Sequence, residues 1–236
     1  MVDIKLDDLQ YIADSSGKNE PTLKKFKILM NAIFKYAVIH DIIPPDMNKV
    51  SYLNIKKAGN PDRRDRMPFS TAEIQKLWKH KDANGYCNVI LMLIYTGCRI
   101  SELLALKKED INLQEKWFDI KKSKTAAGVR RVPIADKVLP FFEHWYNLND
   151  CEYLISTPEG KPFEYRNYYD SYWKPLIEQL NMKHRPHDTR HTCVSLLAAA
   201  GIDERIIKKI VGHAGQGVTE NVYTHYELES LREAIN

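Results

Sequence analysis

The spacing of apolar residues along the chain predicts a protein built mostly of helices. Between Leu23 and Val38, apolar side chains recur every three or four residues, which is the period of one face of a helix. The pattern stops before the proline pair at 44–45, through which a helix cannot continue. Together with a shorter stripe of the same kind nearer the start, it predicts a small helical module over residues 1–56.

A new set of elements begins at residue 70. Ser70 followed by Glu73 is a capping box, in which each side chain accepts a hydrogen bond from the other residue's backbone N–H. The segments 117–120 and 130–134 predict two short strands, joined by a turn that ends at Gly128. We therefore expect a mostly helical α+β domain with one small antiparallel sheet. Apolar spacing predicts its helices at about 84–96, 101–107, 136–148 and 166–180, and again from 187 onward.

The segment between these two regions is basic. Residues 56–66 hold five Lys or Arg and two Asp, and they also contain Gly and Pro, which favour irregular backbone. We expect an exposed, positively charged linker over residues 57–69.

The last ten residues, 227–236, predict an amphipathic helical tail. Leu228, Leu231 and Ile235 form one apolar stripe along it. This stripe packs either on the tail's own domain or on a neighbouring copy of the chain, and the sequence leaves both alternatives open.

Composition narrows the class of protein. The 236 residues are 44% hydrophobic and 28% charged, which is typical of a globular protein. The net charge of +4 is too small to indicate nucleic acid by itself. The longest apolar run, Val89–Tyr95, is far shorter than the roughly 20 residues that span a bilayer, and we expect no membrane segment and no leader. Four widely spaced cysteines without a CxxC pair are typical of free thiols in a reducing cytoplasm.

The segment 187–191, His-Asp-Thr-Arg-His, contains the first candidate chemistry. On a helix, His187 and Arg190 lie on one face. Histidine can move a proton near neutral pH, and arginine holds phosphate through two parallel N–H groups. An ordinary histidine beside a surface arginine explains the pair equally well. His187 and His191 also have the spacing of two zinc ligands, but the glutamate of the HExxH motif is missing.

Three further segments carry groups suited to phosphate or nucleic acid. Arg99 lies at the start of a predicted helix, where Glu102 can hold it by a charge-assisted hydrogen bond. The hairpin region 122–131 is rich in Lys and Arg, which suits a nucleic-acid groove but also protects a sheet edge from aggregation. His213 follows a glycine on a predicted loop. Tyr223 lies ten residues further on, and a tyrosine becomes a nucleophile only where a base or a positive charge helps to remove its proton.

Taken in order along the chain, these segments resemble the tyrosine recombinase (phage integrase) family. An arginine, a hairpin lysine, His-x-x-Arg, Gly-His and a tyrosine near the end follow one another within residues 70–226. The segments 96–103 and 187–191 are similar to family signatures almost letter for letter. The resemblance implies catalytic roles for Arg99, Lys124, His187, Arg190, His213 and Tyr223.

The chemistry that the resemblance implies is transesterification at phosphorus. The two arginines and His213 would stabilise charge on the non-bridging oxygens. Tyr223 would attack, displace the 5′-hydroxyl and form a 3′-phosphotyrosyl link. Lys124 would protonate the leaving oxygen, and His187 would accept the tyrosine proton. The bond energy stays in the protein–DNA ester, so no metal ion, ATP or other cofactor is expected.

The resemblance also implies roles outside the reacting centre. Glu102 and Asp188 are expected to orient the arginines and the helix. Residues 1–56 would be a partial core-binding domain that clamps DNA, with its beginning and any arm-binding domain absent, and residues 70–226 the catalytic domain. The residues expected to contact DNA are Lys57, Arg63, Arg64, Arg66, Lys122, Arg130 and Arg131.

The expected function is site-specific recombination by an integrase of a mobile element, from a phage or a conjugative element, in the cytoplasm and at the nucleoid of a bacterial host. Its expected partners are the double-stranded core of an attachment site, other copies in a tetramer joined by the tail, and accessory DNA-bending proteins. The alternatives are a type IB topoisomerase, a non-catalytic DNA-binding protein of the same fold, and a zinc hydrolase. Tyr226 is a rival nucleophile, but Tyr223 is favoured because Tyr-Thr-His follows the family pattern.

Overall fold

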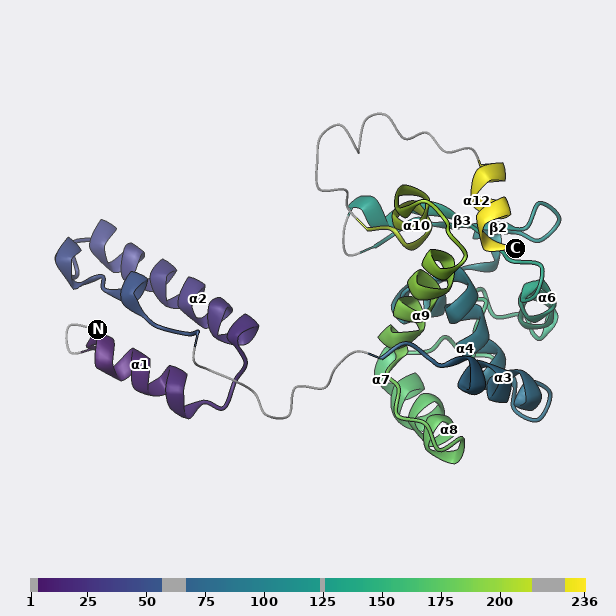
Figure 1. The fold of residues 1–236 in the computed structure, drawn as a ribbon, viewed down its shortest axis with the longest axis horizontal. Helices are drawn as coiled ribbons and strands as arrows, with labels where there is room; N and C mark the ends of the chain where they lie inside the picture. The colour runs from purple at the N-terminus through teal and green to yellow at the C-terminus, as the bar shows by residue number, and fades with distance from the viewer. Residues whose placement is uncertain (1–3, 57–66, 124–125, 214–227) are drawn as a thin grey trace. The chain divides into compact units, whose positions relative to one another are not determined.

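The computed structural model describes residues 4–56, 67–123, 126–213 and 228–236 (Figure 1). The chain divides into two compact units, Met1–Asp65 and Arg66–Asn236, and each is described by itself. Most of the expected linker therefore lies outside the described residues, and so do Lys57, Arg63, Arg64 and Arg66. None of the helices within the described ranges is long and apolar enough to cross a membrane.

Over its described residues, 4–56, the first unit contains two helices and two short 3-10 turns. Helix α1 spans Leu6–Ser15 and α2 spans Glu20–Ile39, and the turns are η1 (Pro45–Met47) and η2 (Val50–Tyr52). The predicted helical module is confirmed, and α2 ends ahead of the proline pair as expected. Its small core consists of Leu9, Ala13, Leu23, Phe34, Ala37, Ile43, Val50 and Leu53.

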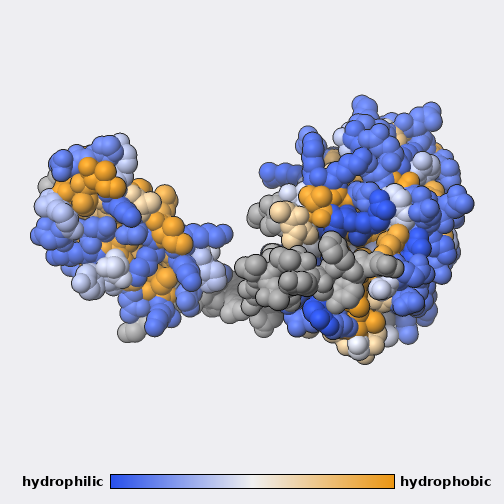
Figure 2. All heavy atoms as spheres, turned by 90° about the horizontal axis from the view of Figure 1, so that it is seen from above, coloured by the Kyte–Doolittle hydropathy of each residue, from blue (hydrophilic) through white to orange (hydrophobic). Residues whose placement is uncertain are grey.

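Large apolar side chains also remain on the surface of the first unit. Figure 2 shows orange surface scattered over it. On α2 these exposed side chains are Ile28, Leu29, Tyr36 and Ile39.

The second unit is mostly helical, as predicted. Ser70 and Glu73 form the expected capping box, with Ser70 N donating to Glu73 Oε2 at 2.8 Å. A five-residue π-helical segment, η5 (Tyr169–Trp173), interrupts the helix predicted near 166–180. The predicted helix 101–107 is shorter than expected and gives way to a 3-10 turn, η3 (Lys108–Asp110). The α-helices are α3 (Thr71–His80), α4 (Gly85–Thr96), α5 (Ile100–Leu104), α6 (Leu139–Asn147), α7 (Tyr165–Tyr168), α8 (Lys174–Gln179), α9 (Pro186–Ala199), α10 (Glu204–Val211) and α12 (Leu228–Ile235).

One small antiparallel sheet completes the second unit. Its strand order is β1 (Ile111–Asn112), β2 (Trp117–Ile120), β3 (Arg130–Pro133), and a 3-10 turn, η4 (Ala126–Gly128), precedes β3. Phe118 pairs with Val132, and both are buried on one face. The predicted fold class is confirmed, and β1 is an addition, since two residues are too few to give an alternating pattern.

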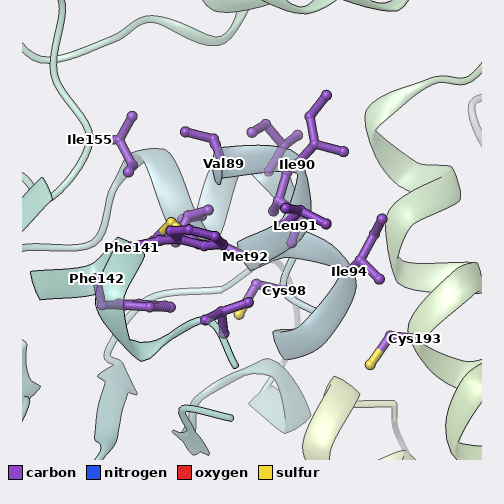
Figure 3. Packing of buried hydrophobic residues seen from close by; sticks show 14 of the residues in the cluster. Val89, Ile90, Leu91, Met92, Ile94, Cys98, Phe141, Phe142, Ile155 and Cys193 are labelled. Atoms are coloured by element: carbon purple, nitrogen blue, oxygen red, sulfur yellow. The ribbon is translucent and has the colours of Figure 1, made fainter. Parts of the chain in front are cut away.

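Helix α4 lies in the centre of the core of this unit. Its residues from Cys87 to Ile94 are buried, which explains why this segment is apolar on all sides (Figure 3). Helices α3, α6 and α9 pack against it. Burial raises the pKa of the Cys193 thiol on α9 to about 12, and the described cysteines are free thiols, as expected.

The tail helix α12 packs on its own unit. It lies against β3 and α10, with Leu231 and Ile235 buried. The side chain of Arg232 donates to the carbonyl of Glu115, and Asp136 N donates to Asn236 Oδ1 at 2.8 Å. Of the two alternatives that the sequence left open, the structure of this single chain therefore has the tail on its own domain.

Candidate active site

The end of helix α4 brings two of the predicted arginines together. Gly97 ends α4 with a φ of 63°, and its carbonyl oxygen accepts a hydrogen bond from Arg190 Nη1 at 2.9 Å. A Cβ atom at Gly97 would lie 2.8 Å from Cγ1 of Val211, so both the turn and the packing require glycine. Arg99 follows two residues later as the N-cap of α5. The short Thr-Gly-Cys-Arg turn thus links α4, α5 and the side chain of Arg190.

Glu102 holds Arg99 as the sequence suggested. Its Oε1 lies 2.6 Å from Arg99 Nη1, and its Oε2 accepts from Arg99 N at 3.0 Å. Ser123 Oγ donates to the same carboxylate at 2.7 Å. Burial by itself would raise the pKa of Glu102, but Arg130 and these hydrogen bonds hold it below its ordinary value of 4.5. Glu102 is therefore an ionised group that fixes the Arg99 guanidinium.

Arg190 is a buried cation with unused hydrogen-bond donors. Only 1% of its surface is exposed, and its Nε and Nη2 have no hydrogen-bond partner among the described residues. Burial, followed by repulsion from Arg99 and Arg130, lowers its pKa to about 10, so it stays charged at neutral pH. Buried N–H donors without partners are costly, and an anion that accepts from them removes this cost.

The two predicted histidines lie near one another, and His213 lies within range of the charges of Arg190 and Arg99. His187 is exposed in the first turn of α9, and its ring meets that of His191 edge to face, with the centroids 4.8 Å apart. His213 follows Gly212, which ends α10 with a φ of 68°. Partial burial, then the charges of Arg190, Arg99 and the two α9 histidines, lower the pKa of His213 below its ordinary 6.5. At neutral pH it is therefore a neutral imidazole that can donate one N–H.

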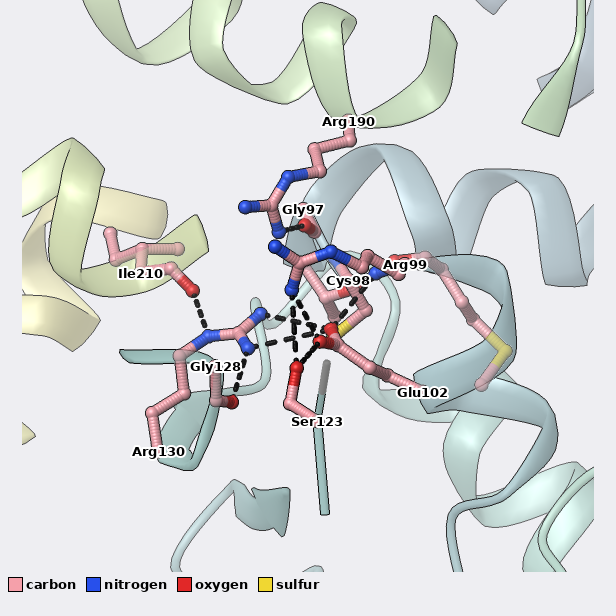
Figure 4. Close-up of polar contacts among 11 residues, drawn as sticks. Gly97, Cys98, Arg99, Glu102, Ser123, Gly128, Arg130, Arg190 and Ile210 are labelled. Atoms are coloured by element: carbon pink, nitrogen blue, oxygen red, sulfur yellow. Dashed lines mark hydrogen bonds and ion pairs between the residues drawn. The ribbon is translucent and has the colours of Figure 1, made fainter. Parts of the chain in front are cut away.

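Arg130 requires a correction. We expected it on the exposed hairpin in contact with DNA, but only 7% of its surface is accessible. Its Nε donates to the Ile210 carbonyl at 2.7 Å and its Nη1 to the Gly128 carbonyl at 2.8 Å, and both Nη atoms lie 3.4 Å from Glu102 Oε2 (Figure 4). The reason is strand alternation, which turns residue 130 inward and residue 131 outward.

The neighbouring basic residues lie at the surface. Arg131 binds Asp119 through Nε at 2.9 Å, and its guanidinium lies 3.5 Å from the ring centroid of Trp117. Lys122 is exposed. Lys124 and the tyrosines Tyr223 and Tyr226 lie outside the described residues.

Asp188 fixes the start of helix α9. Its Oδ2 accepts from Arg185 N at 2.8 Å, and this bond caps the helix that carries His187 and Arg190. His184 lies close by, with Nε2 3.1 Å from Glu73 Oε1 and its ring stacked on Phe69. The contacts of His184 with Glu73 and of Ser123 with Glu102 do not follow from local sequence, because these partners are distant along the chain.

The zinc hypothesis finds no support in the geometry. Over the described ranges, no group of three or more His, Cys, Asp or Glu side chains is placed to hold a metal ion. His187 and His191 thus have no third ligand there.

The electrostatics of the site indicate a class of ligand. Arg99 and Arg130 bind the Glu102 carboxylate, Arg190 lies within range of its charge, and His213 lies within the field of Arg190 and Arg99. Such a centre favours a group with several negative oxygens, and arginine pairs well with phosphate. Fold and site together define a mostly helical protein with a cationic centre whose donors suit a phosphate group.

Comparison with known proteins identifies the family. The model of the phage integrase family matches residues 69–229, and the chain belongs to this family. Among similar curated proteins is a "Tyrosine recombinase XerC-like" of Caldanaerobacter subterraneus subsp. tengcongensis, 24% identical over 260 aligned residues, with 93% of this chain and 66% of that protein covered. Tyrosine recombinase XerC of Proteus mirabilis is 30% identical over 199 residues, covering 76% of this chain and 64% of that protein. The chain spans about half to two thirds of the length of the curated relatives named first.

Solved structures with the same fold include two integrases. The Tn1549 transposon integrase in complex with a circular intermediate DNA has a TM-score of 0.76 at 22% identity, covering 98% of this chain and 84% of that one. A lambda integrase tetramer bound to a Holliday junction has a TM-score of 0.72 at 16% identity, covering 92% and 66%. The resemblance seen in the sequence is thus confirmed at the level of family and fold.

Proposed function

We propose that this chain is a site-specific DNA recombinase that cleaves and rejoins DNA through a 3′-phosphotyrosyl intermediate. The observation that carries the proposal is Arg190, which is buried, charged and left with two unpartnered donors beside Arg99. The family match and relatives that are themselves tyrosine recombinases support it.

The described residues bind the phosphate and stabilise its charge. Arg190 donates through Nε and Nη2 to one non-bridging oxygen, and Arg99, fixed by Glu102, donates to the other. His213 adds a neutral N–H donor. Attack at phosphorus concentrates negative charge on these oxygens, and fixed donors in a site partly shielded from water stabilise that charge strongly.

The bond-making roles are assigned to residues by the family pattern. Tyr223 attacks phosphorus and becomes the 3′-phosphotyrosyl group, while the 5′-oxygen leaves with a proton from Lys124. His187, at the start of α9, accepts the tyrosine proton. The 5′-hydroxyl later attacks the same phosphorus and releases the tyrosine, so the cycle needs no external energy.

The proposal extends to domains and partners. Residues 1–56 would clamp DNA, residues 57–69 would connect the clamp, residues 70–226 would carry the chemistry and residues 227–236 would be the tail. The substrate would be the core of an attachment site of a mobile element. Four copies would act together, in line with the lambda integrase tetramer on a Holliday junction, and DNA-bending proteins would assist.

The experiment is covalent trapping. A nicked duplex carrying the terminal sequence of the encoding element loses the short fragment that bears the new 5′-hydroxyl after cleavage, so religation is prevented, and the phosphotyrosyl complex accumulates and is seen on a denaturing gel. We expect the complex with the wild-type chain and with Tyr226→Phe, and none with Tyr223→Phe. A complex that survives Tyr223→Phe refutes the assigned nucleophile. Relaxation of a supercoiled plasmid that lacks the site would favour a topoisomerase instead.

A further inference from the structure

Arg130 is a buried cation to which the proposed reaction gives no task. Its side chain is 2% exposed, so it cannot reach DNA. The geometry points to Arg130 as a positioning residue, which holds the phosphate-binding side chains of the active site in place without touching the phosphate. This inference rests on the proposed function and adds a residue to it.

The contacts of Arg130 join three separate elements. Its guanidinium meets Glu102 on α5, the Gly128 carbonyl in η4 and the Ile210 carbonyl on α10. Glu102 and Ile210 are 28 and 80 residues away along the chain. Glu102 in turn holds Arg99, and Ile210 lies three residues before His213. The side chain of Arg130 therefore contacts both Glu102, which holds Arg99, and the end of α10, which leads to His213.

The backbone next to His213 is shaped around this guanidinium. A Cβ atom at Gly212 would lie 2.8 Å from Arg130 Nη1 and 2.9 Å from the Ala127 carbonyl oxygen. Because no side chain is present there, Arg130 lies directly against the residue that precedes His213. The φ of 68° at Gly212 also suits glycine, so both the turn and the contact depend on it.

Arg130 lies within reach of charges of both signs. It attracts the Glu102 carboxylate and helps to hold the pKa of that residue below 4.5, but it repels Arg190 and contributes to the lowered pKa there. An apolar residue would avoid the repulsion and the cost of burying a cation, but it would lose the attraction to Glu102. The planar guanidinium presents hydrogen-bond donors to three acceptors at fixed angles. Neither an apolar residue nor a lysine ammonium can do this. Arg130 therefore acts through the fixed positions of its hydrogen-bond donors, and another residue of the same charge does not replace it.

The test compares Arg130→Lys with Arg205→Lys in the full chain. Arg205 lies at the exposed start of α10 and pairs with Asp203, so it is a matched substitution outside the site. Three quantities are measured: affinity for the nicked duplex by gel shift, the single-turnover rate of covalent complex formation, and the melting temperature. We expect Arg130→Lys to slow covalent complex formation about tenfold to a hundredfold with affinity within about twofold of wild type. Arg205→Lys should match the wild type in all three.

Each outcome decides a separate point. A wild-type rate in Arg130→Lys overturns the inference, and so does a loss of affinity as large as the loss of rate. If the variant does not fold, Arg130→Ala with added methylguanidinium replaces it: restored cleavage supports the inference, and no restoration overturns it. If the wild-type chain itself forms no covalent complex on the duplex, the proposed function fails, which is a different result from equal rates in wild type and variant.

Discussion

Replacing Glu102 by glutamine removes the carboxylate that binds Arg99 and Arg130 and keeps the size of the side chain. In the folded chain this carboxylate accepts from Arg99 Nη1 at 2.6 Å, Arg99 N at 3.0 Å and Ser123 Oγ at 2.7 Å, with Arg130 at 3.4 Å. An amide keeps one accepting oxygen and turns two N–H donors toward other donors. Breaking a buried ion pair by removing one partner costs about 3–5 kcal/mol, and we expect Glu102→Gln to lower the free energy of unfolding by that amount.

The effect of Glu102→Gln should depend on pH in a defined direction. The pKa of Glu102 lies below its ordinary 4.5 in the folded chain, so its carboxylate stabilises the fold above that pH. This stabilisation is lost as the pH falls from 4.5 through the folded value. The difference in unfolding free energy between wild type and variant should therefore be constant near neutral pH and shrink below about 4.5.

Urea unfolding followed by tryptophan fluorescence measures this difference. All four tryptophans, Trp78, Trp117, Trp145 and Trp173, lie in the second unit, so the signal reports on that unit alone. Glu143→Gln, at an exposed position on α6, is the control and should change the free energy by less than about 0.5 kcal/mol. A Glu102→Gln variant as stable as the control, or a difference that does not shrink in acid, would refute the reasoning.

Three further predictions concern the same site. Arg190→Lys keeps the charge but loses the fork, and it should reduce the single-turnover cleavage rate about 10²- to 10³-fold; a rate within a few-fold of wild type contradicts the role given to Arg190. Because the pKa of His213 is lowered in the folded chain, the unfolded chain takes up the proton first as the pH falls below 6.5, and the wild type loses stability. The variant His213→Gln should not show this loss. Melting temperatures at pH 8 and in mild acid check this, and parallel curves count against it. Gly97→Ala should cost well over about 1 kcal/mol of unfolding free energy, since it combines positive φ with a contact of 2.8 Å, whereas Gly201→Ala meets open space and should cost less.

Local patterns in the sequence were enough to predict most of the architecture. The capping box at Ser70, the apolar α4 and the alternation around Phe118 depend on neighbours within a few residues, so they can be read without the fold. The order of Arg99, Lys124, His187, Arg190, His213 and Tyr223 along the chain was likewise sufficient to indicate the family.

Tertiary structure decided which side chains the site uses and how. Arg130 looked like an exposed hairpin cation, and only its contact with Ile210, 80 residues away, shows that it is buried. Arg190 donates to the carbonyl of Gly97, which lies 93 residues away along the chain. The tail helix α12 packs on its own unit, which the sequence left open. Sequence periodicity reports which face of an element is apolar, whereas hydrogen bonds between distant elements depend on how those faces pack together. The clustering of Arg99, Arg130 and Arg190, with Glu102 bound to the first two, is a property of that packing.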